Sequence, residues 1–407
     1  MISNIIIVGG GASGIFCAIS LLELGLPIYL FEKNRVLGKK LLASGNGRCN
    51  IHNLNTHVSC YQSSSFNSRA IQYILGNLSF LEFEKCCKKL GLLLTQQSDG
   101  RVYPNSQSAK SVLEIFSLKL EEGKVRIHLE EEILKIYRDS KNFFVQSSKG
   151  TYQSTYLILA CGSEAHPKLG GSNKGLELAK SLGLEITQTY PSLVPLKLDT
   201  YSLRELSGVK LKVKITLKVN AKIEKEVVDD LLFTPYGISG FGVLDISSQI
   251  KKSQNNVLII DFLPNFEEEF LEQTMLKLHK SFPQRSLLHL LNGFLPPKFA
   301  KVFMGVLKIK QCDRKNIKKL IFYLKNWEFK NPKPQGFENA EVSGGGISAN
   351  SLKIDTLESK TIRGLYIIGE MLDVVGDRGG YNLAFAWASA RVCAESLKNC
   401  ITLRLKS

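Results

Sequence analysis

The first thirty-two residues alternate between short apolar runs and one glycine-rich turn. Ile5–Val8 is a run of β-branched residues, which favours a buried parallel strand. Ser13–Leu24 has helical periodicity, and Gly25 ends it. A second apolar run, Pro27–Phe31, is closed by Glu32. The pattern predicts a complete βαβ unit at the start of the chain.

The turn of this unit has the spacing of a dinucleotide fingerprint, with glycine at positions 9, 11 and 14. Gly9 permits a tight turn, Gly11 lets the backbone approach a pyrophosphate, and Gly14 lets the helix pack closely on the strand. The helix N-terminus supplies N–H donors and the positive end of the helix dipole. Glu32 can accept hydrogen bonds from both ribose hydroxyls and disfavours the 2′-phosphate of NADP. FAD and NAD remain.

The next segment predicts helices and then short strands. Helical patterns occupy residues 68–90, in two pieces, and 107–122, separated by a predicted turn DGRVYPNS at 99–106. Short strands follow from 125 to 159. The last one, Tyr156–Ala160, runs into Cys161-Gly162-Ser163, a small-residue turn where backbone can approach a ligand.

The pattern changes near Pro191 and returns to glycine-rich turns after residue 340. Residues 209–219 alternate as a strand, 257–263 is a second strand, and 266–326 is mainly helical. No second glycine fingerprint lies in 190–330, which argues against a plan with two nucleotide-binding domains.

The C-terminal part predicts a second cofactor contact. The strand Leu365–Ile368 ends in Gly369-Glu370, and a loop ending in Gly379-Gly380 precedes a long helix. Its start at 381–383 offers N–H groups to the partial negative charge at the N1–C2=O edge of a flavin. Glu370 could reach ribityl hydroxyls. Together with the first βαβ unit, this pattern favours FAD.

The net charge of the chain bears on whether its partner is a nucleic acid or a membrane. The 407 residues carry a formal net charge of +16, which invites a nucleic-acid or anionic-membrane partner. The densest basic stretch, 307–330, has lysines at helical spacing beside apolar residues, which predicts an amphipathic helix with a solvated lysine face. The lysines are Lys315, Lys318, Lys319 and Lys325.

Nine cysteines without framework spacing indicate reduced thiols in a cytoplasmic protein, and no residue spacing predicts a metal site. Residues 5–31 lack a positive leading segment and are interrupted by glycines and Glu23, so we expect neither a signal peptide nor a membrane span.

Seven segments resemble the HI0933-like family of bacterial FAD-dependent oxidoreductases. They are GGGASG (9–14), GKKLLASGNGRCN (38–50), DGRVYPNS (99–106), LILACG (157–162), PSLVPL (191–196), LLFTPYGISG (231–240) and GLYIIGEMLDVVGDRGGYNLAFAWASA (364–390). Two departures stand out. Cys161-Gly162-Ser163 replaces the more usual Thr-Gly-Gly, and Pro235 stands where the family often has histidine.

The resemblance implies an α/β fold with a discontinuous Rossmann-like FAD domain of the two-dinucleotide-binding type. The expected segments are an FAD domain at 1–190 and 331–407, an inserted β-barrel-like domain at 191–264 and a small helical domain at 265–330. The cofactor-binding residues it implies run from the glycine turn to the last helix. They are Gly9, Gly11, Ala12, Ser13, Gly14, Glu32, Lys33, Gly38, Lys40, Ser44, Gly45, Asn46, Gly47, Arg48, Cys49, Asn50, Ile133, Ala160, Gly162, Gly369, Glu370, Gly380, Tyr381, Asn382 and Leu383.

The expected activity is hydride exchange between flavin N5 and an unidentified small organic substrate, with NAD(P)H as a transient electron donor. Candidate proton donors are His166, Arg378 and Tyr381. The favoured interpretation of each is non-catalytic: a solvent-exposed loop residue, a structural charge and a helix-start packing residue, respectively. The alternatives are a flavoprotein acting on tRNA and a non-catalytic flavin-binding redox protein.

The stretch SGNGRCN at 44–50 has three interpretations: a tight turn, a ligand cradle and a redox-active thiol. We favour the cradle, because the stretch follows GKKLLA directly after the predicted adenosine-binding strand. Cys49 is expected to be a packing neighbour, since the next cysteine, Cys60, has no paired spacing.

Overall fold

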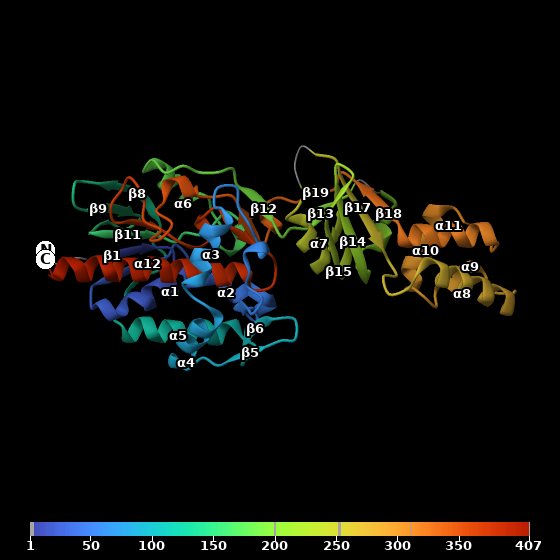
Figure 1. The fold of residues 1–407 in the computed structure, drawn as a ribbon, viewed down its shortest axis with the longest axis horizontal. Helices are drawn as coiled ribbons and strands as arrows, with labels where there is room; N and C mark the ends of the chain where they lie inside the picture. The colour runs from blue at the N-terminus through green and yellow to red at the C-terminus, as the bar shows by residue number, and fades with distance from the viewer. Residues whose placement is uncertain (1–3, 199–200, 251–253, 310, 407) are drawn as a thin grey trace. The chain divides into compact units, whose positions relative to one another are not determined.

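The computed structural model describes residues 4–198, 201–250, 254–309 and 311–406, and the chain forms two compact units (Figure 1). One comprises Met1–Pro191 with Glu341–Ser407, and the other comprises Ser192–Ala340. The sequence placed the return to the FAD domain at residue 331. The unit boundary lies later, because the two strands between 327 and 334 pair within the sheet of the second unit.

A five-stranded parallel sheet forms the centre of the first unit, in the order β21-β11-β1-β2-β7. Strand β1 lies in the middle, with Ile5 opposite Tyr156 on one side and Ile28 on the other. Parallel strands place all their carboxyl ends at one edge, so the turns after β1, β11, β21 and β2 meet there. The bounds are β1 Ile5–Val8, β2 Ile28–Phe31, β7 Arg126–His128, β11 Tyr156–Leu159 and β21 Leu365–Ile367.

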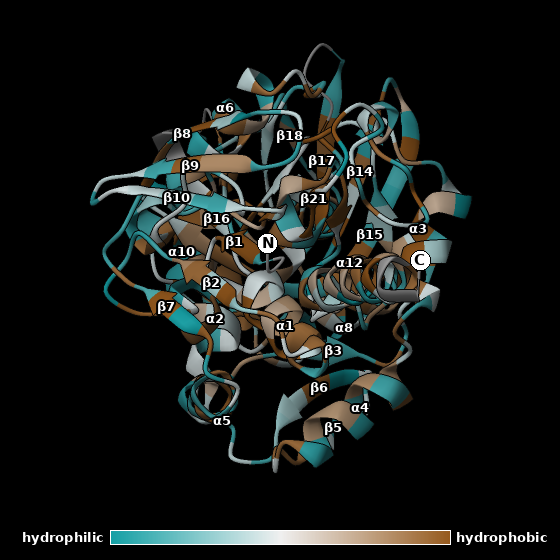
Figure 2. Cartoon of the chain, turned by 90° about the vertical axis from the view of Figure 1, so that its left-hand side faces the viewer, coloured by the Kyte–Doolittle hydropathy of each residue, from teal (hydrophilic) through white to brown (hydrophobic). Residues whose placement is uncertain are grey.

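Helices α1 (Ala12–Leu21) and α12 (Tyr381–Lys406) pack against each other beside this sheet, as Figure 2 shows. They bring the first and last segments of the chain together. The other elements of this unit are α2 Lys39–Ala43, α3 Ser68–Gly76, α4 Phe80–Lys89, α5 Ala109–Glu122, α6 Lys174–Ser181, β3 His52–Asn53, β4 Tyr61–Gln62, β5 Leu94–Gln96, β6 Arg101–Pro104, β8 Ile133–Arg138, β9 Phe143–Ser147, β10 Thr151–Ser154, β12 Tyr190–Ser192, β20 Val342–Gly344 and β22 Val375–Gly376.

The DGRVYPNS segment differs from its sequence-based prediction as a turn. Arg101–Pro104 forms β6, the central strand of the antiparallel sheet β3-β6-β5. Val102 lies opposite His52, and Arg101 lies opposite Asn53. Asp99 and Gly100 lie in the tight connection from β5, whereas β3 is remote in sequence, so a local turn signal could not reveal the pairing with β3.

The described part of the second unit combines a seven-stranded antiparallel sheet with five helices on a common apolar core. The described pairings give the order β18-β17-β14-β15-β16-β13-β19, with β18 and β19 at the edges. The bounds are β13 Leu196–Lys197, β14 Lys210–Val219, β15 Lys222–Thr234, β16 Gly237–Ser239, β17 Asn256–Asp261, β18 Trp327–Lys330, β19 Lys333–Pro334, α7 Phe241–Ser247, α8 Glu268–Ser281, α9 Leu287–Leu291, α10 Pro297–Leu307 and α11 Arg314–Lys325.

Helix α11 confirms the amphipathic prediction, except at its last lysine. Ile317, Leu320, Ile321 and Leu324 are buried. Lys318 is exposed, but the Lys325 side chain is only 13% exposed and lies 2.6 Å from Asp261 on β17. Its ammonium also donates to the carbonyl oxygens of Leu263 and Phe266. Lys325 therefore joins the helix to the sheet and is not part of a solvated face.

All nine cysteines are free thiols. Within the ranges that the structure describes, no helix is both long enough and apolar enough to span a membrane.

Candidate FAD site

The glycine turn after β1 combines two tightly packed glycines with one that faces open space. A Cβ on Gly9 would lie 2.3 Å from the Ala160 carbonyl oxygen, and one on Gly14 would lie 2.0 Å from that of Gly9. A Cβ on Gly11 would meet no atom within 4 Å. Gly11 caps α1 in an extended conformation without a side-chain cap, so no capping side chain accepts from the first N–H groups of the helix.

Glu32, at the end of β2, is almost completely buried and is bound to the glycine turn. Its Oε2 accepts a hydrogen bond from the Gly10 N–H at 2.9 Å, and its Oε1 accepts one from the Asn34 N–H at 2.8 Å. The Asn34 side-chain amide also donates to Oε1. A carboxylate has about four lone-pair sites, so capacity for about one ribose hydroxyl is left. Gly38, in the left-handed region, donates to the Gly10 carbonyl and so ties α2 to the same turn.

The turn after β21 packs against the start of α1. A Cβ on Gly369 would lie 2.3 Å from the Ser13 Oγ, so these two positions touch. The carboxylate of Glu370 lies 2.8 Å from the Lys40 ammonium and accepts the Ser343 N–H at 3.1 Å. The structure thus pairs Glu370, expected to reach the ribityl hydroxyls, with Lys40, another of the expected cofactor-binding residues.

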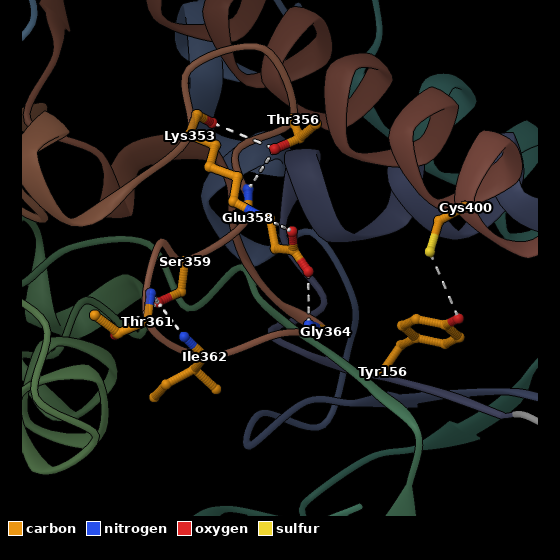
Figure 3. A network of polar contacts seen from close by, with 9 residues as sticks. All are labelled: Tyr156, Lys353, Thr356, Glu358, Ser359, Thr361, Ile362, Gly364 and Cys400. Carbon is orange, nitrogen blue, oxygen red and sulfur yellow. Dashed lines mark hydrogen bonds and ion pairs between the residues drawn. The ribbon is translucent and has the colours of Figure 1, made fainter. Parts of the chain in front are cut away.

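A polar network in the loop before β21 fixes where this strand begins (Figure 3). Glu358 accepts hydrogen bonds from the Gly364 N–H and from the Lys353 ammonium, both at 2.8 Å. Ser359 Oγ accepts the N–H groups of Thr361 and Ile362. These polar contacts therefore hold the loop on both sides of the turn that leads into β21. Gly369 and Glu370 come just after that strand in the chain.

The SGNGRCN stretch is an irregular loop with successive left-handed residues. Gly45, Asn46 and Gly47 have φ values of 58°, 56° and 82°, and Cys49 has a φ of 60°. The Asn50 amide is oriented so that both its nitrogen and its oxygen have partners. The nitrogen donates to the Val102 and His52 carbonyls, and the oxygen accepts the Gly380 N–H. The stretch is therefore joined to the start of α12. That contact supports the cradle interpretation over an isolated turn.

Cys49 is completely buried, and burial raises the pKa of its thiol to about 12. A thiol with this pKa stays protonated at neutral pH and is a poor nucleophile. We expect Cys49→Ser to retain wild-type FAD content and wild-type flavin reduction, with stability lowered by about 1 kcal/mol. Flavin absorbance per polypeptide and anaerobic reduction measure this. A variant that binds FAD but cannot be reduced would reinstate the thiol interpretation.

The start of α12 is held from several sides. The Asn382 amide group donates to the Gly376 carbonyl at 2.8 Å, and its Oδ1 accepts the Gly376 N–H at 2.8 Å. The Tyr61 hydroxyl donates to the Tyr381 carbonyl, and the two rings meet edge to face. Burial, with Cys60 and Asp377 nearby, raises the pKa of the Tyr381 phenol, so this hydroxyl remains protonated.

The other two proton-donor candidates lie in loops. His166 adopts a left-handed conformation before the short 3₁₀ turn Pro167–Leu169 and is half-buried. Arg378 is also half-buried, three residues before α12. Among the three candidates, Tyr381 is the one that belongs to the helix start itself.

The remaining predicted residues lie either at the turn after β11 or near Glu32. Ala160 and Gly162 follow β11 at the central turns, where a Cβ on Gly162 would lie 3.8 Å from the Glu370 Oε2. Lys33 is exposed directly after β2. Ile133 is buried in β8, and the nearby Glu131 N–H donates to the Glu32 carbonyl. These last two positions lie on the Glu32 side of the site.

Two residues missed by the sequence reasoning lie beside α12. The Asn53 amide donates to the Gly379 carbonyl at 2.7 Å, and Arg101 lies opposite Asn53 across β3 and β6. Asn53 lies shortly after SGNGRCN, and Arg101 lies within DGRVYPNS. Their proximity to these two family-like segments was the sequence signal that could have identified them. Their positions depend on strand pairing that no local pattern displays.

These features fit the groups of FAD. The open space at Gly11, next to uncapped N–H groups, suits a pyrophosphate, and an added side chain would fill it. Glu32 suits a ribose. The helix start of α12 supplies a second positive dipole end for a flavin.

Comparison with known proteins agrees with this fit. The sequence profile of the HI0933-like protein Rossmann domain matches residues 3–396. The chain belongs to the HI0933-like family of FAD-dependent oxidoreductases. It is therefore an enzyme of the flavoprotein class.

Three curated relatives are similar to nearly the whole chain. A 3-dehydro-bile acid delta(4,6)-reductase from Clostridium scindens is 32% identical, over 94% of this chain and 96% of its own length. A ribosomal RNA dihydrouridine synthase from Haemophilus influenzae is 32% identical over 97% and 98%. One of the same name from Escherichia coli is 31% identical over 96% and 97%. Similar proteins thus carry two different substrate names.

Proposed function

We propose that this enzyme is an FAD-dependent reductase that saturates a carbon–carbon double bond conjugated with a carbonyl in a small organic substrate. The activities named for its relatives share this chemistry. A 3-oxo-Δ4,6 steroid is a conjugated dienone, and dihydrouridine is uridine with a saturated C5=C6 bond. When bound, FAD supplies the hydride. The observation that carries the proposal is the open, uncapped start of α1 at Gly11, because it suits the cofactor on which this reaction depends.

The chain's own groups have separate tasks in this proposal. The N–H groups after Gly11 bind the pyrophosphate, with Ser13 at the same turn, and Glu32 binds the adenosine ribose. Lys40 and Glu370, paired at 2.8 Å, orient the ribityl chain. The start of α12 at Asn382 and Leu383 holds the edge of the flavin ring that gains negative charge on reduction.

NAD(P)H is the proposed electron donor. Among the described sheets of the first unit, a single parallel sheet carries a glycine turn of the fingerprint type. A nicotinamide would therefore bind transiently beside the flavin and leave before the substrate arrives.

A uracil ring in RNA is a second candidate substrate. The formal net charge of +16 favours it, since a phosphate backbone attracts such a protein. Two of the three relatives are named for this reaction. The chemistry at the double bond would be the same.

Anaerobic spectroscopy tests the proposal. We expect NADH or NADPH to bleach the yellow holoenzyme, and 4-androstene-3,17-dione, a conjugated enone, to restore the colour with a gain of two hydrogens in the product. Recovery with deproteinised ribosomal RNA alone would select the second candidate. A dithionite-reduced enzyme that neither compound reoxidises would contradict reductase function and favour a non-catalytic flavin-binding protein.

A further inference from the structure

The DGRVYPNS segment has no role in the binding of FAD described above. As β6 it pairs with β3, with Arg101 opposite Asn53. The Asn53 amide binds the Gly379 carbonyl at 2.7 Å, in a buried hydrogen bond. Strand β6 is therefore fixed in register with the segment that leads into α12.

The Arg101 guanidinium lies beside the start of α12. A Cβ on Gly379 would lie 3.7 Å from the Arg101 Nε and 3.7 Å from the Tyr381 Cε2, so these two side chains approach each other on one side of this glycine. The Arg101 side chain is 27% exposed, and its Nε lies 3.3 Å from the Asp99 carboxylate. In the described part of the chain, no hydrogen bond joins its terminal amino groups to another residue.

A second positive group lies on the same face of β6. Residues 101 and 103 point to one side of the strand, because side chains alternate. The Arg48 guanidinium lies over the Tyr103 ring, 5.2 Å from its centre. A planar guanidinium with free terminal N–H groups is suited to a carbonyl or anionic oxygen, which it can bind through two parallel hydrogen bonds.

We propose that Arg101 binds the carbonyl oxygen of the reducible substrate and stabilises the negative charge that this oxygen gains during reduction. The inference rests on the proposed reductase function and assigns a catalytic residue to it. Tyr381, which approaches the same Cβ position of Gly379, is the proton donor for the adjacent carbon. The two residues would thus serve the two ends of one conjugated system.

The electrons and protons balance as follows. A hydride from the reduced cofactor adds to the carbon β to the carbonyl, and the π electrons of the double bond move to give an enolate whose oxygen lies on Arg101. The Tyr381 hydroxyl gives its proton to the α carbon, and solvent water restores that proton. NAD(P)H, the proposed donor, returns two electrons to the cofactor.

Arg101→Met tests this role, with Arg101→Lys to restore the charge and Arg138→Met as a matched control at an exposed position on β8. One readout is equilibrium binding of 4-androstene-3,17-dione to the oxidised holoenzyme, followed by the shift of the flavin spectrum. The other is the rate at which this enone reoxidises the reduced flavin in stopped flow. FAD content and thermal unfolding are measured for every variant.

We expect Arg101→Met to keep its FAD, to bind the enone about tenfold more weakly and to reoxidise about a hundredfold more slowly. Arg101→Lys should recover part of both losses, and Arg138→Met should match the wild type. Wild-type binding and rate in Arg101→Met would overturn the inference and leave the reductase function intact. Loss of FAD from Arg101→Met would also overturn it, by giving Arg101 a cofactor role. A wild-type enzyme that no enone or RNA reoxidises would reject the reductase function itself.

Discussion

Gly11→Val is expected to abolish FAD retention while the apoprotein stays folded. The position adopts φ −83° and ψ −171°, an extended conformation that valine accepts, and an added Cβ meets no protein atom within 4 Å. The valine side chain would instead fill the space proposed for the pyrophosphate. Loss of two charge-assisted hydrogen bonds weakens FAD binding by at least about a hundredfold. Flavin absorbance per polypeptide measures retention, and circular dichroism measures the fold.

Two other glycines separate this effect from general damage. Gly76→Val, at the end of α3, also places its Cβ in open space and should retain wild-type FAD. Gly14→Ala forces a Cβ to 2.0 Å from the Gly9 carbonyl oxygen, so stability and FAD should fall together. Normal flavin content in Gly11→Val would show that the cofactor does not bind at this turn.

Lys325→Met is expected to destabilise the second unit by about 3 kcal/mol. The Lys325 and Asp261 side chains are 13% and 16% exposed and lie 2.6 Å apart. Removing the ammonium leaves a largely buried carboxylate unpaired and also leaves the Leu263 and Phe266 carbonyls without their donor. Urea unfolding followed by hydrogen exchange in α11 and β17 measures the loss within this unit.

Lys318→Met is the matched control on the same helix. Its ammonium is 3.6 Å from Glu272 and its side chain is 56% exposed, so the change should stay within about 0.5 kcal/mol. Adding Asp261→Asn to Lys325→Met should recover part of the loss, because the unpaired charge is gone. Equal stability of Lys325→Met and Lys318→Met would mean that the Asp261 pair contributes nothing.

The elements read best from the sequence are those whose signal is local. The βαβ unit needs only Ile5–Val8, the spacing of the glycines and the periodicity after Ser13, and the structure reproduces it within a few residues. The apolar stripe of α11 is equally local. Side-chain period and turn chemistry are properties of neighbouring residues, so a single segment carries them.

The elements read wrongly are those whose partners are remote in sequence. DGRVYPNS has the composition of a turn, and Asp99 and Gly100 do lie in the turn after β5, yet Arg101–Pro104 is a central strand because the remote strand β3 pairs with its other edge. Lys325 has the spacing of a surface lysine, yet β17 places Asp261 beside it. Both outcomes depend on contacts that the residue order along one segment does not encode.

For the site, the sequence by itself determined the glycine turn, the acid after the second strand and the likeness to FAD-dependent oxidoreductases. Only the tertiary structure decided that Gly11, unlike Gly9 and Gly14, faces open space, that Lys40 pairs with Glu370, and that Arg101 and Tyr381 both approach Gly379. The physical reason is that a fingerprint is set by backbone conformation within one turn, whereas contacts between remote side chains are set by the packing of strands and helices distant in the chain.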